Sequence, residues 1–445
     1  MKRKLLQIMG QAAFAVLRKV DYYITGSNSG FTREEEVEDP YRTLKVLRDR
    51  GSILRTYTNR GWMVLGFEEA QALFKDQRFG SDIRKNKFLS SMLRFASDGR
   101  SVMFLDNPTL LNLDPPDHTR LRKLVAQGFL HKFILSMEPR IASIVRQCLD
   151  EYDPASGQFD IVRQLAKPLP AIVIAELLGL PESDLPRFQK LSEELLGLTA
   201  IGNDEEMKLG AIANEELVNY FKEIIGLKRE NPDQALISRL IQAEEEGDRL
   251  TADELYSTCG LLLVAGHETT TRLIGNGLYV LLNHPDQLKK LLDNPSLTPN
   301  AIEEILRYEP PVQLMPRFAL EDAEFFGKKI KKNQLIVPMI ASANRDPAAN
   351  DNPDDFDISR ENIKHVSFGH GIHLCLGLTL ARLEGRIAIN ILLERFPDMT
   401  LADQKIVWTP LPLVRGMDNL VIKTNESPAK IDQARLERAR LQLEG

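Results

Sequence analysis

The sequence is short of three features, each of which would point to a particular class of protein. No run of apolar residues approaches the roughly 18 needed for a membrane-spanning helix, so we expect no transmembrane segment. Its 57 Lys and Arg residues against 63 Asp and Glu residues give a net charge of −6, which argues against a nucleic-acid binder that depends on bulk positive charge. Three cysteines (Cys148, Cys259 and Cys375) are too few and too scattered for a disulfide framework, and this favours a reducing, cytoplasmic location.

The remaining composition is that of a globular protein. Of the 445 residues, 43% are apolar and 27% are charged, and the chain has neither repeats nor Gly/Ser linkers. We therefore expect one large domain over residues 39–424, flanked by two extensions. Residues 1–38 are expected to form an amphipathic helix followed by a charged segment, and residues 425–445 a charged tail, helical or mobile. The basic N-terminal helix is expected to pack on the domain, with peripheral contact with a membrane surface as the alternative.

Periodicity and capping signals predict mainly helical structure. The capping box Thr251-Ala252-Asp253-Glu254 predicts a helix from there to about Asn283, ahead of His284-Pro285. A second helix is predicted from an N-cap at Thr298, with Pro299 in its first turn, to Tyr308. Short β-like segments at residues 61–65 and 335–340 complete a fold that is mainly α with small β-sheets (α+β).

The segment His365–Gly377 carries the strongest chemical signal. It is a glycine-rich loop that delivers one thiol, Cys375, to the start of a helix beginning at Leu378. A helix N-terminus lowers the pKa of a thiol, and glycines let a flat or bulky group approach the backbone. A zinc site is the alternative, because His365, His370, His373 and Cys375 lie close together in the sequence.

A second segment, Ala265-Gly266-His267-Glu268-Thr269-Thr270, lies in the middle of the predicted long helix. A buried acid beside a hydroxyl is costly unless it is used or well bonded, and Gly266 opens a groove on the helix. Thr269 can bond back to a main-chain carbonyl. The zinc-protease motif fails here, because it would need a histidine at position 271, which is Thr271.

Two further segments give weaker evidence for a functional site when each is taken alone. Glu304 and Arg307 share one helix face, as ordinary surface ion pairs often do. His118 and Arg122, at i and i+4 after Asp114-Pro115-Pro116, could hold an anion or form a solvated basic face.

Taken together and in this order, the four segments resemble a cytochrome P-450 of the soluble bacterial type, over about residues 39–424. Phe368-Gly369-x-Gly371-x-His373-x-Cys375-x-Gly377 is similar to the haem-binding loop of that family. Residues 265–270 resemble its oxygen-activating stretch, and Glu304-x-x-Arg307 its structural ion pair. Asn344 to Pro347, Phe356, Asp357 and Arg360 resemble the segment that locks this pair.

The resemblance implies a haem-thiolate monooxygenase with haem b as cofactor and O2 as co-substrate. Cys375 would be the axial ligand of the haem iron. Phe368, Gly369 and Gly377 would lie at the proximal haem face. The haem propionates would be held by His118, Arg122, Arg317 and His373. Glu268 and Thr269 would deliver protons to dioxygen, Ala265 and Gly266 would make room for it, and Glu304 and Arg307 would be structural.

The resemblance also implies a lipophilic substrate and a separate electron donor. The pocket would be lined by Leu261, Val264, Ala265, Val312 and Leu413, with residues 86–113 as a lid and Leu411 nearby. No flavin or nicotinamide motif is present, so electrons from NAD(P)H would arrive through a ferredoxin or flavodoxin and its reductase. Candidate docking charges are Arg120, Lys123, Lys132, Arg382 and Arg386. We expect a monomer. A peroxide-driven haem-thiolate enzyme and a haem-bearing protein that binds a ligand without turnover are the alternatives.

Overall fold

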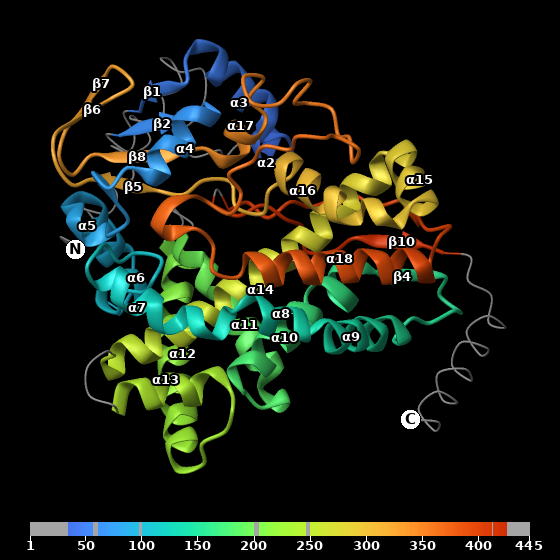
Figure 1. The fold of residues 1–445 in the computed structure, drawn as a ribbon, viewed down its shortest axis with the longest axis horizontal. Helices are drawn as coiled ribbons and strands as arrows, with labels where there is room; N and C mark the ends of the chain where they lie inside the picture. Colours follow the sequence, from blue (N-terminus) through green and yellow to red (C-terminus); the bar gives the residue numbers. More distant parts are fainter. Residues whose placement is uncertain are drawn as a thin grey trace.

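The computed structural model describes residues 34–56, 61–97, 100–199, 204–245, 250–411 and 413–424. Helices make up most of these residues and surround the long helix α14 (Ala252–Asn283), while a five-stranded sheet lies at one end of the molecule (Figure 1). This confirms the predicted class, mainly α with small β-sheets. Of the predicted extensions, only the short helix α2 (Glu34–Glu38) falls within the described residues; the amphipathic N-terminal helix and residues 425–445 lie outside them.

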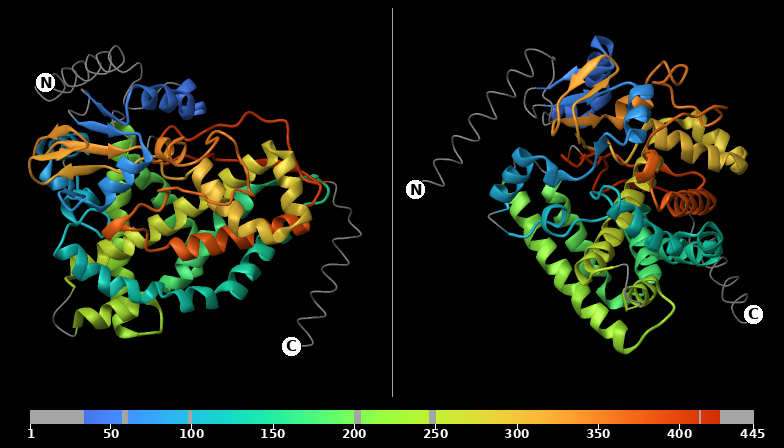
Figure 2. Two further views of the ribbon diagram at one scale, coloured as in Figure 1. Left: turned by 45° about the horizontal axis from the view of Figure 1, so that its top comes forward. Right: turned by 60° about the vertical axis from the view of Figure 1, so that its left-hand side comes forward.

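The helices fall into two groups (Figures 1 and 2). Those beside the five-stranded sheet, or linking it to the helical body, are α3 (Pro40–Arg50), α4 (Phe67–Lys75), α5 (Lys87–Ala96), α6 (Met103–Asp106) and α17 (Ile340–Asn344). The helical body contains α7 (Asp117–Val125), α8 (His131–Ser136), α9 (Glu138–Asp150), α10 (Pro168–Leu178), α11 (Leu185–Leu195), α12 (Asp204–Glu230), α13 (Leu236–Glu245), α14, α15 (Pro285–Asp293), α16 (Thr298–Tyr308) and α18 (Leu378–Arg395).

Short helical turns connect these elements. They are η1 (Ile83–Lys85), η2 (Ala126–Phe129), η4 (Glu182–Asp184), η5 (Leu196–Thr199), η6 (Pro295–Leu297) and η7 (Gly371–His373), together with the π-helical turn η3 (Val162–Ala166).

The described strands form three small sheets. The five-stranded sheet has the order β1 (Ile53–Arg55), β2 (Trp62–Val64), β8 (Leu335–Pro338), β5 (Arg317–Ala319) and β3 (Phe79–Gly80), with β2 and β8 parallel and the other pairs antiparallel. The others are the sheet β4 (Gln158–Asp160), β10 (Val421–Lys423) and β9 (Thr400–Leu401), and the hairpin β6 (Ala323–Phe325) and β7 (Lys328–Ile330). Both predicted strands are confirmed, but the second ends at Pro338 because Ile340 already begins α17.

Helix α14 runs through the middle of the molecule and has the predicted bounds. Thr251 Oγ1 accepts a hydrogen bond from the Glu254 backbone N–H at 3.2 Å, and a Glu254 side-chain oxygen accepts from the Thr251 N–H at 2.8 Å. This reciprocal cap satisfies two backbone donors that would otherwise be free. Over its 32 residues the helix packs against α10, α12, α16 and α18, so its side chains face several parts of the core.

Helix α16 has the predicted bounds, but the predicted N-cap role of Thr298 is wrong. Thr298 is already the first helical residue, because the turn η6 runs directly into the helix. Its hydroxyl donates to the Pro295 carbonyl at 2.7 Å and lies against Asn390 of α18. The hydroxyl therefore ties α16 to its surroundings instead of capping it.

The largest hydrophobic core lies where α9, α10, α14, α16 and α18 meet. Cys148 on α9 and Cys259 on α14 are buried in it as free thiols. Among the described helices, none is long and apolar enough to cross a membrane.

Candidate active site

The loop before α18 presents Cys375 at the start of that helix. Gly369 and Gly371 have φ values of +66° and +68°, a conformation that favours glycine. A Cβ on Gly371 would lie 2.4 Å from the Phe74 carbonyl oxygen, so only glycine fits beside α4. The Cys375 backbone N–H donates to the Phe368 carbonyl at 2.9 Å and closes the loop.

The electrostatics at Cys375 correct one expectation. Burial raises the pKa of the thiol above its usual value, against the opposing effects of the Gly377 N–H, Arg122 and Arg382. The sequence predicts a lowered pKa from the helix N-terminus, but in the protein alone burial outweighs that contribution. A positively charged partner at the sulfur would be needed to hold it as a thiolate.

The histidines of this loop point to different places. His365 Nε2 lies 3.0 Å from a carboxylate oxygen of Glu303, whereas the His373 ring packs on His118 with 4.1 Å between ring centroids. His370 Nδ1 lies 3.3 Å from the Gly369 carbonyl. No group of three or more His, Cys, Asp or Glu side chains in the described part of the chain is arranged to hold a metal ion. The zinc alternative is therefore wrong.

Four of the predicted site residues come together as a cluster of basic groups, which we call the basic cradle: His118, Arg122, Arg317 and His373. His118 and Arg317 are buried. Burial together with neighbouring cations lowers the pKa of His118 to about 4 and that of His373 to about 3, and burial lowers the pKa of Arg317 to about 10 against the opposing charge of Asp114. Both ring nitrogens of His118 and Nε2 of His373 have no hydrogen-bond partner.

The arginines of the basic cradle bond only to main-chain carbonyls among the described residues. Arg317 Nη1 donates to the Pro316 carbonyl at 3.0 Å, and Arg122 Nη2 to the Leu374 carbonyl at 2.5 Å, next to Cys375. Buried cations and bare ring nitrogens are unfavourable without a counter-charge. The cradle is therefore suited to an anionic group that the protein itself does not supply.

On α14, the residues of the second segment divide between two sides of the helix. Ala265 is exposed and Leu261, Val264 and Thr269 are half-buried, although most of the surrounding helix is buried, so these residues border an open space. Thr269 Oγ1 donates to the Ala265 carbonyl at 2.9 Å, as predicted. The expectation that Gly266 opens a groove on the helix is wrong. A Cβ at Gly266 would lie 3.0 Å from Ile174 of α10, so the glycine allows α14 and α10 to pack closely.

Glu268 lies on the buried side of α14. One of its carboxylate oxygens accepts from Arg272 Nη2 at 3.3 Å, and the other lies 3.5 Å from His267 Nδ1. Both contacts are longer than the 2.7–2.9 Å usual for charge-assisted hydrogen bonds. Burial lowers the pKa of His267, so this ring is neutral near pH 7, and neither ring nitrogen has a hydrogen-bond partner.

Glu304 and Arg307 form a bidentate ion pair on α16. Both side chains are fully buried, and Arg307 donates to the two carboxylate oxygens at 2.7 Å each. The segment predicted to lock the pair does so: Arg307 also donates to the carbonyls of Asn344, Pro353 and Asp355, and Glu304 accepts from the Asp357 N–H and Arg360. The alternative of an ordinary surface pair is wrong.

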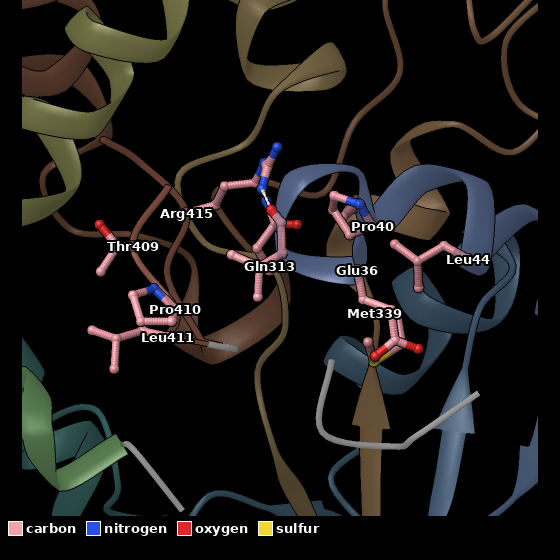
Figure 3. A pocket seen from close by; sticks show the side chains of 11 residues that line it. Glu36, Pro40, Leu44, Gln313, Met339, Thr409, Pro410, Leu411 and Arg415 are labelled. Atoms are coloured by element: carbon pink, nitrogen blue, oxygen red, sulfur yellow. Dashed lines mark hydrogen bonds between the residues drawn. The ribbon is translucent and has the colours of Figure 1, made fainter. Parts of the chain in front are cut away.

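The predicted substrate-pocket residues outside α14 lie on adjacent segments. Val312 pairs with Val414 in an isolated bridge, and the Gln313 N–H donates to the Leu413 carbonyl at 2.9 Å. A pocket of about 40 Å³ lies behind these segments, between α3 and residues 409–415 (Figure 3). It includes Leu411 and Thr409 but none of the predicted catalytic residues, so it is separate from the Cys375 loop.

Three of the five candidate docking charges already have acidic partners. Arg120 pairs with Glu254, Arg382 with Glu303 and Arg386 with Glu138. Lys123 and Lys132 are exposed. The surface of the Cys375 loop is also apolar, since Ile372 and Leu374 are each 37% exposed. Phe133 is 39% exposed on α8, which packs against α18.

Sequence reasoning missed three residues that contact the predicted site. Arg272 pairs with Glu268, Thr409 accepts from Arg272 Nη1 at 3.1 Å, and Glu303 binds both His365 and Arg382. The i,i+4 spacing of Glu268 and Arg272 on a predicted helix could have revealed the first contact. Nothing in the sequence indicates the other two.

Comparisons with known proteins agree on one family. The model of the family described as Cytochrome P450 matches residues 82–409. The chain is 39% identical to the Cytochrome P450 monooxygenase PikC of Streptomyces venezuelae, over 88% of this chain and 93% of that protein. It is 40% identical to the 6-deoxyerythronolide B hydroxylase of Saccharopolyspora erythraea, over 86% and 96%. Among solved structures, P450BioI in complex with an acyl carrier protein that carries hexadec-9Z-enoic acid has a TM-score of 0.81 at 36% identity, over 88% of this chain and all of that one.

Proposed function

The chain belongs to the cytochrome P-450 family and is a haem-thiolate monooxygenase, and we propose how its own residues divide the work of that reaction. The enzyme inserts one oxygen atom from O2 into a lipophilic small molecule, with electrons that come from NAD(P)H through separate partner proteins. Haem b, when bound, supplies the iron at which dioxygen is activated.

The proposed haem contacts rest mainly on the basic cradle. His118, Arg122, Arg317 and His373 would bind the haem propionates, because these buried or half-buried basic groups form no hydrogen bond or ion pair with an acid among the described residues. Cys375 would be the axial thiolate. Phe368 and Gly369 would lie against the proximal face, and at Gly377 no protein atom lies within 4 Å of a Cβ position, which leaves room for a flat group. The basic cradle is the single observation on which the proposed haem site depends.

The proposed distal residues act on oxygen and protons. Ala265 borders the open space beside α14 and would leave room for dioxygen. Thr269 and Glu268 would form the acid–alcohol pair that brings protons there, with the Thr269 hydroxyl held in place by the Ala265 carbonyl. Gly266 would act through close packing of α14 on α10, and Glu304 and Arg307 through the fold.

The proposed substrate is lipophilic, because no charged side chain stands out among the residues that would line its site. Leu261, Val264, Ala265, Val312 and Leu413 would line its site, with α5 and α6 within the predicted lid. The names of the relatives suggest two probes. One is 6-deoxyerythronolide B, which names the hydroxylase of one relative. The other is hexadec-9Z-enoic acid, which is attached to the acyl carrier protein in the complex with P450BioI.

The proposed electron donor is a ferredoxin or flavodoxin that docks over the Cys375 loop. Ile372, Leu374 and Phe133 would provide apolar contact, and Lys123 and Lys132 would attract an acidic carrier. Arg120, Arg382 and Arg386 contribute less than the sequence suggests, because acidic neighbours offset their charges. We further propose that the enzyme works in the cytoplasm as a monomer. Peripheral membrane contact through the N-terminal helix predicted within residues 1–38 is the alternative.

The carbon monoxide difference spectrum of the reduced holoprotein tests the axial ligand. The wild-type protein should give the thiolate signature, and Cys375→Ala should abolish it. Cys148→Ala and Cys259→Ala are matched controls, since both thiols are buried in the core, and each should keep the signature. If the signature persists in Cys375→Ala, the ligand assignment is wrong.

Product analysis tests the source of oxygen and electrons. With 6-deoxyerythronolide B or hexadec-9Z-enoic acid as probe, a ferredoxin, its reductase and NADPH should give a product labelled from ¹⁸O2. Product formed with hydrogen peroxide but not with the electron-transfer proteins would favour the peroxide-driven alternative. NADPH consumption that no ligand changes would favour a protein that binds without turnover.

A further inference from the structure

A cavity with a polar wall lies on the buried side of α14, behind Glu268, and has a volume of about 180 Å³. The polar wall is formed by Glu268, Thr271 and Arg272 of α14, by Lys167 before α10, by Glu193 of α11, by Thr409 and by Asp418, and the apolar wall by Leu196, Leu411 and Met417. Lys167 and Glu193 form an ion pair of 2.7 Å whose side chains are 30% and 47% exposed. This ion pair therefore stands where the cavity meets solvent.

The groups around this cavity require water. Thr271 Oγ1 and Arg272 Nε are buried and have no hydrogen-bond partner among the described residues, although both residues border the cavity. A polar space that offers about 15 Å³ for each water can hold several ordered molecules. We call it the water chamber.

Arg272 is fixed from outside its own helix. Its Nη1 donates to Thr409 Oγ1 at 3.1 Å, and its Nη2 donates to Glu268 at 3.3 Å. A Cβ on Gly416 would lie 2.6 Å from Nη1, so the chain leaves space there for the guanidinium. Thr409 and Gly416 thus set the position of Arg272. Arg272 in turn draws the Glu268 carboxylate toward the water chamber.

We propose that Arg272 is a positioning residue of the proton relay: it holds the Glu268 carboxylate at the water chamber, where the carboxylate takes up a proton before releasing it toward Thr269. This inference rests on the proposed function, in which Glu268 and Thr269 form the acid–alcohol pair. The long 3.3 Å contact suits the role, because a bidentate pair would hold the carboxylate too firmly to move.

The step balances in protons and moves no electrons. A chamber water gives one proton to Glu268 and regains one from solvent past Lys167 and Glu193. The neutral carboxyl leaves Arg272, passes its proton toward the Thr269 hydroxyl and returns as a carboxylate. The charged or titratable groups that face it are His267 and Arg272 on α14, Lys167, Glu193 and, at the chamber wall, Asp418.

The test measures how the enzyme reduces oxygen when no substrate is added. With a ferredoxin, its reductase and NADPH, consumed oxygen ends as hydrogen peroxide or, if protons arrive in time, as water. Arg272→Gln should raise the ratio of peroxide to water at least about threefold, since positioned proton donors contribute roughly 10²–10⁴-fold to a step. It should also enlarge the solvent deuterium isotope effect on oxygen consumption. Arg272→Lys, which keeps the charge, should restore a large part of the wild-type ratio.

Controls separate this role from a structural one. Lys190→Gln removes a positive charge from α11 outside the water chamber and should change neither readout. The carbon monoxide spectrum of Arg272→Gln should match wild type, so a lost thiolate signature in Cys375→Ala remains a separate test of the proposed function. Thr409→Val, which removes only the hydroxyl that holds Arg272, should shift both readouts in the same direction by less. Folded Arg272→Gln and Thr409→Val proteins with wild-type ratios and isotope effects would overturn the proposal.

Discussion

In the described part of the chain, two buried Glu–Arg pairs each lie within one helix, and they differ in almost every contact. Glu304 and Arg307 on α16 are fully buried, share two hydrogen bonds of 2.7 Å and are bonded further to Asn344, Pro353 and Asp355. Glu268 and Arg272 on α14 are 7% and 9% exposed and share one contact of 3.3 Å, beside a cavity of about 180 Å³.

The difference shows that the same type of residue pair can have a structural role in one helix and a functional role in another. A buried ion pair offsets its desolvation cost only when its geometry is good and its remaining polar atoms are bonded, as at Glu304 and Arg307. Such a pair holds the loop of residues 344–360 in place and has no freedom to move. At Glu268 and Arg272 the water chamber can supply the missing hydrogen bonds, so the carboxylate can leave its partner at low cost.

The largest effect should come from breaking the tight pair. In Glu304→Gln, the Arg307 charge stays buried without an acid, which costs about 3–5 kcal/mol. That is a large part of the 5–15 kcal/mol that stabilises a typical domain. We therefore expect a low yield of folded holoprotein, measured by haem content and by the free energy of unfolding in denaturant.

The matched control is a pair of similar spacing at the surface. Lys289 and Asp293 on α15 lie at i and i+4, with side chains 74% and 62% exposed. Asp293→Asn should cost less than about 1 kcal/mol, because solvent already screens this pair. Equal losses in Glu304→Gln and Asp293→Asn would contradict the comparison.

Only local features of the two pairs could be predicted from the sequence. The capping box fixes the start of α14, and the family resemblance identifies Glu304, Arg307 and the segment that locks them. The helix spacing of Glu268 and Arg272 could have indicated their contact, but the contact between Arg272 and Thr409 could not be predicted, because a loop some 137 positions further along the chain has to fold back onto α14. The surroundings of Gly266 likewise depend on a distant segment, since Ile174 of α10 packs against it. Thr298 differs from its prediction for a local reason, because the turn η6 runs directly into α16.

The basic cradle extends the comparison to basic groups that form no ion pair with an acid among the described residues. The pKa of His118 falls from 6.5 to about 4 and that of His373 to about 3 in the protein without haem. Between these values and pH 6.5 the unfolded chain binds more protons than the folded chain, so the stability of the apoprotein falls as the pH is lowered through this window.

Thermal unfolding of apoprotein and holoprotein at pH 7.5 and pH 5 measures this effect. We expect the apoprotein to lose several degrees of Tm at pH 5, and the holoprotein to lose less, since propionates favour the charged histidines. His118→Gln should flatten the pH dependence of the apoprotein, whereas His131→Gln, at an exposed position on α8, should not. An equal pH dependence in both forms would argue against an anion in the cradle.

The smallest effect on stability is expected at Glu268 and Arg272, and it is the sharpest test of the comparison. A double-mutant cycle with Glu268→Gln and Arg272→Gln should give a coupling energy below about 1 kcal/mol, because the contact is long and water can replace it. The same cycle with Glu304→Gln and Arg307→Gln should give several times more. A large coupling between Glu268 and Arg272 would mean that the carboxylate is held too tightly to carry protons, and the positioning role of Arg272 would have to be abandoned.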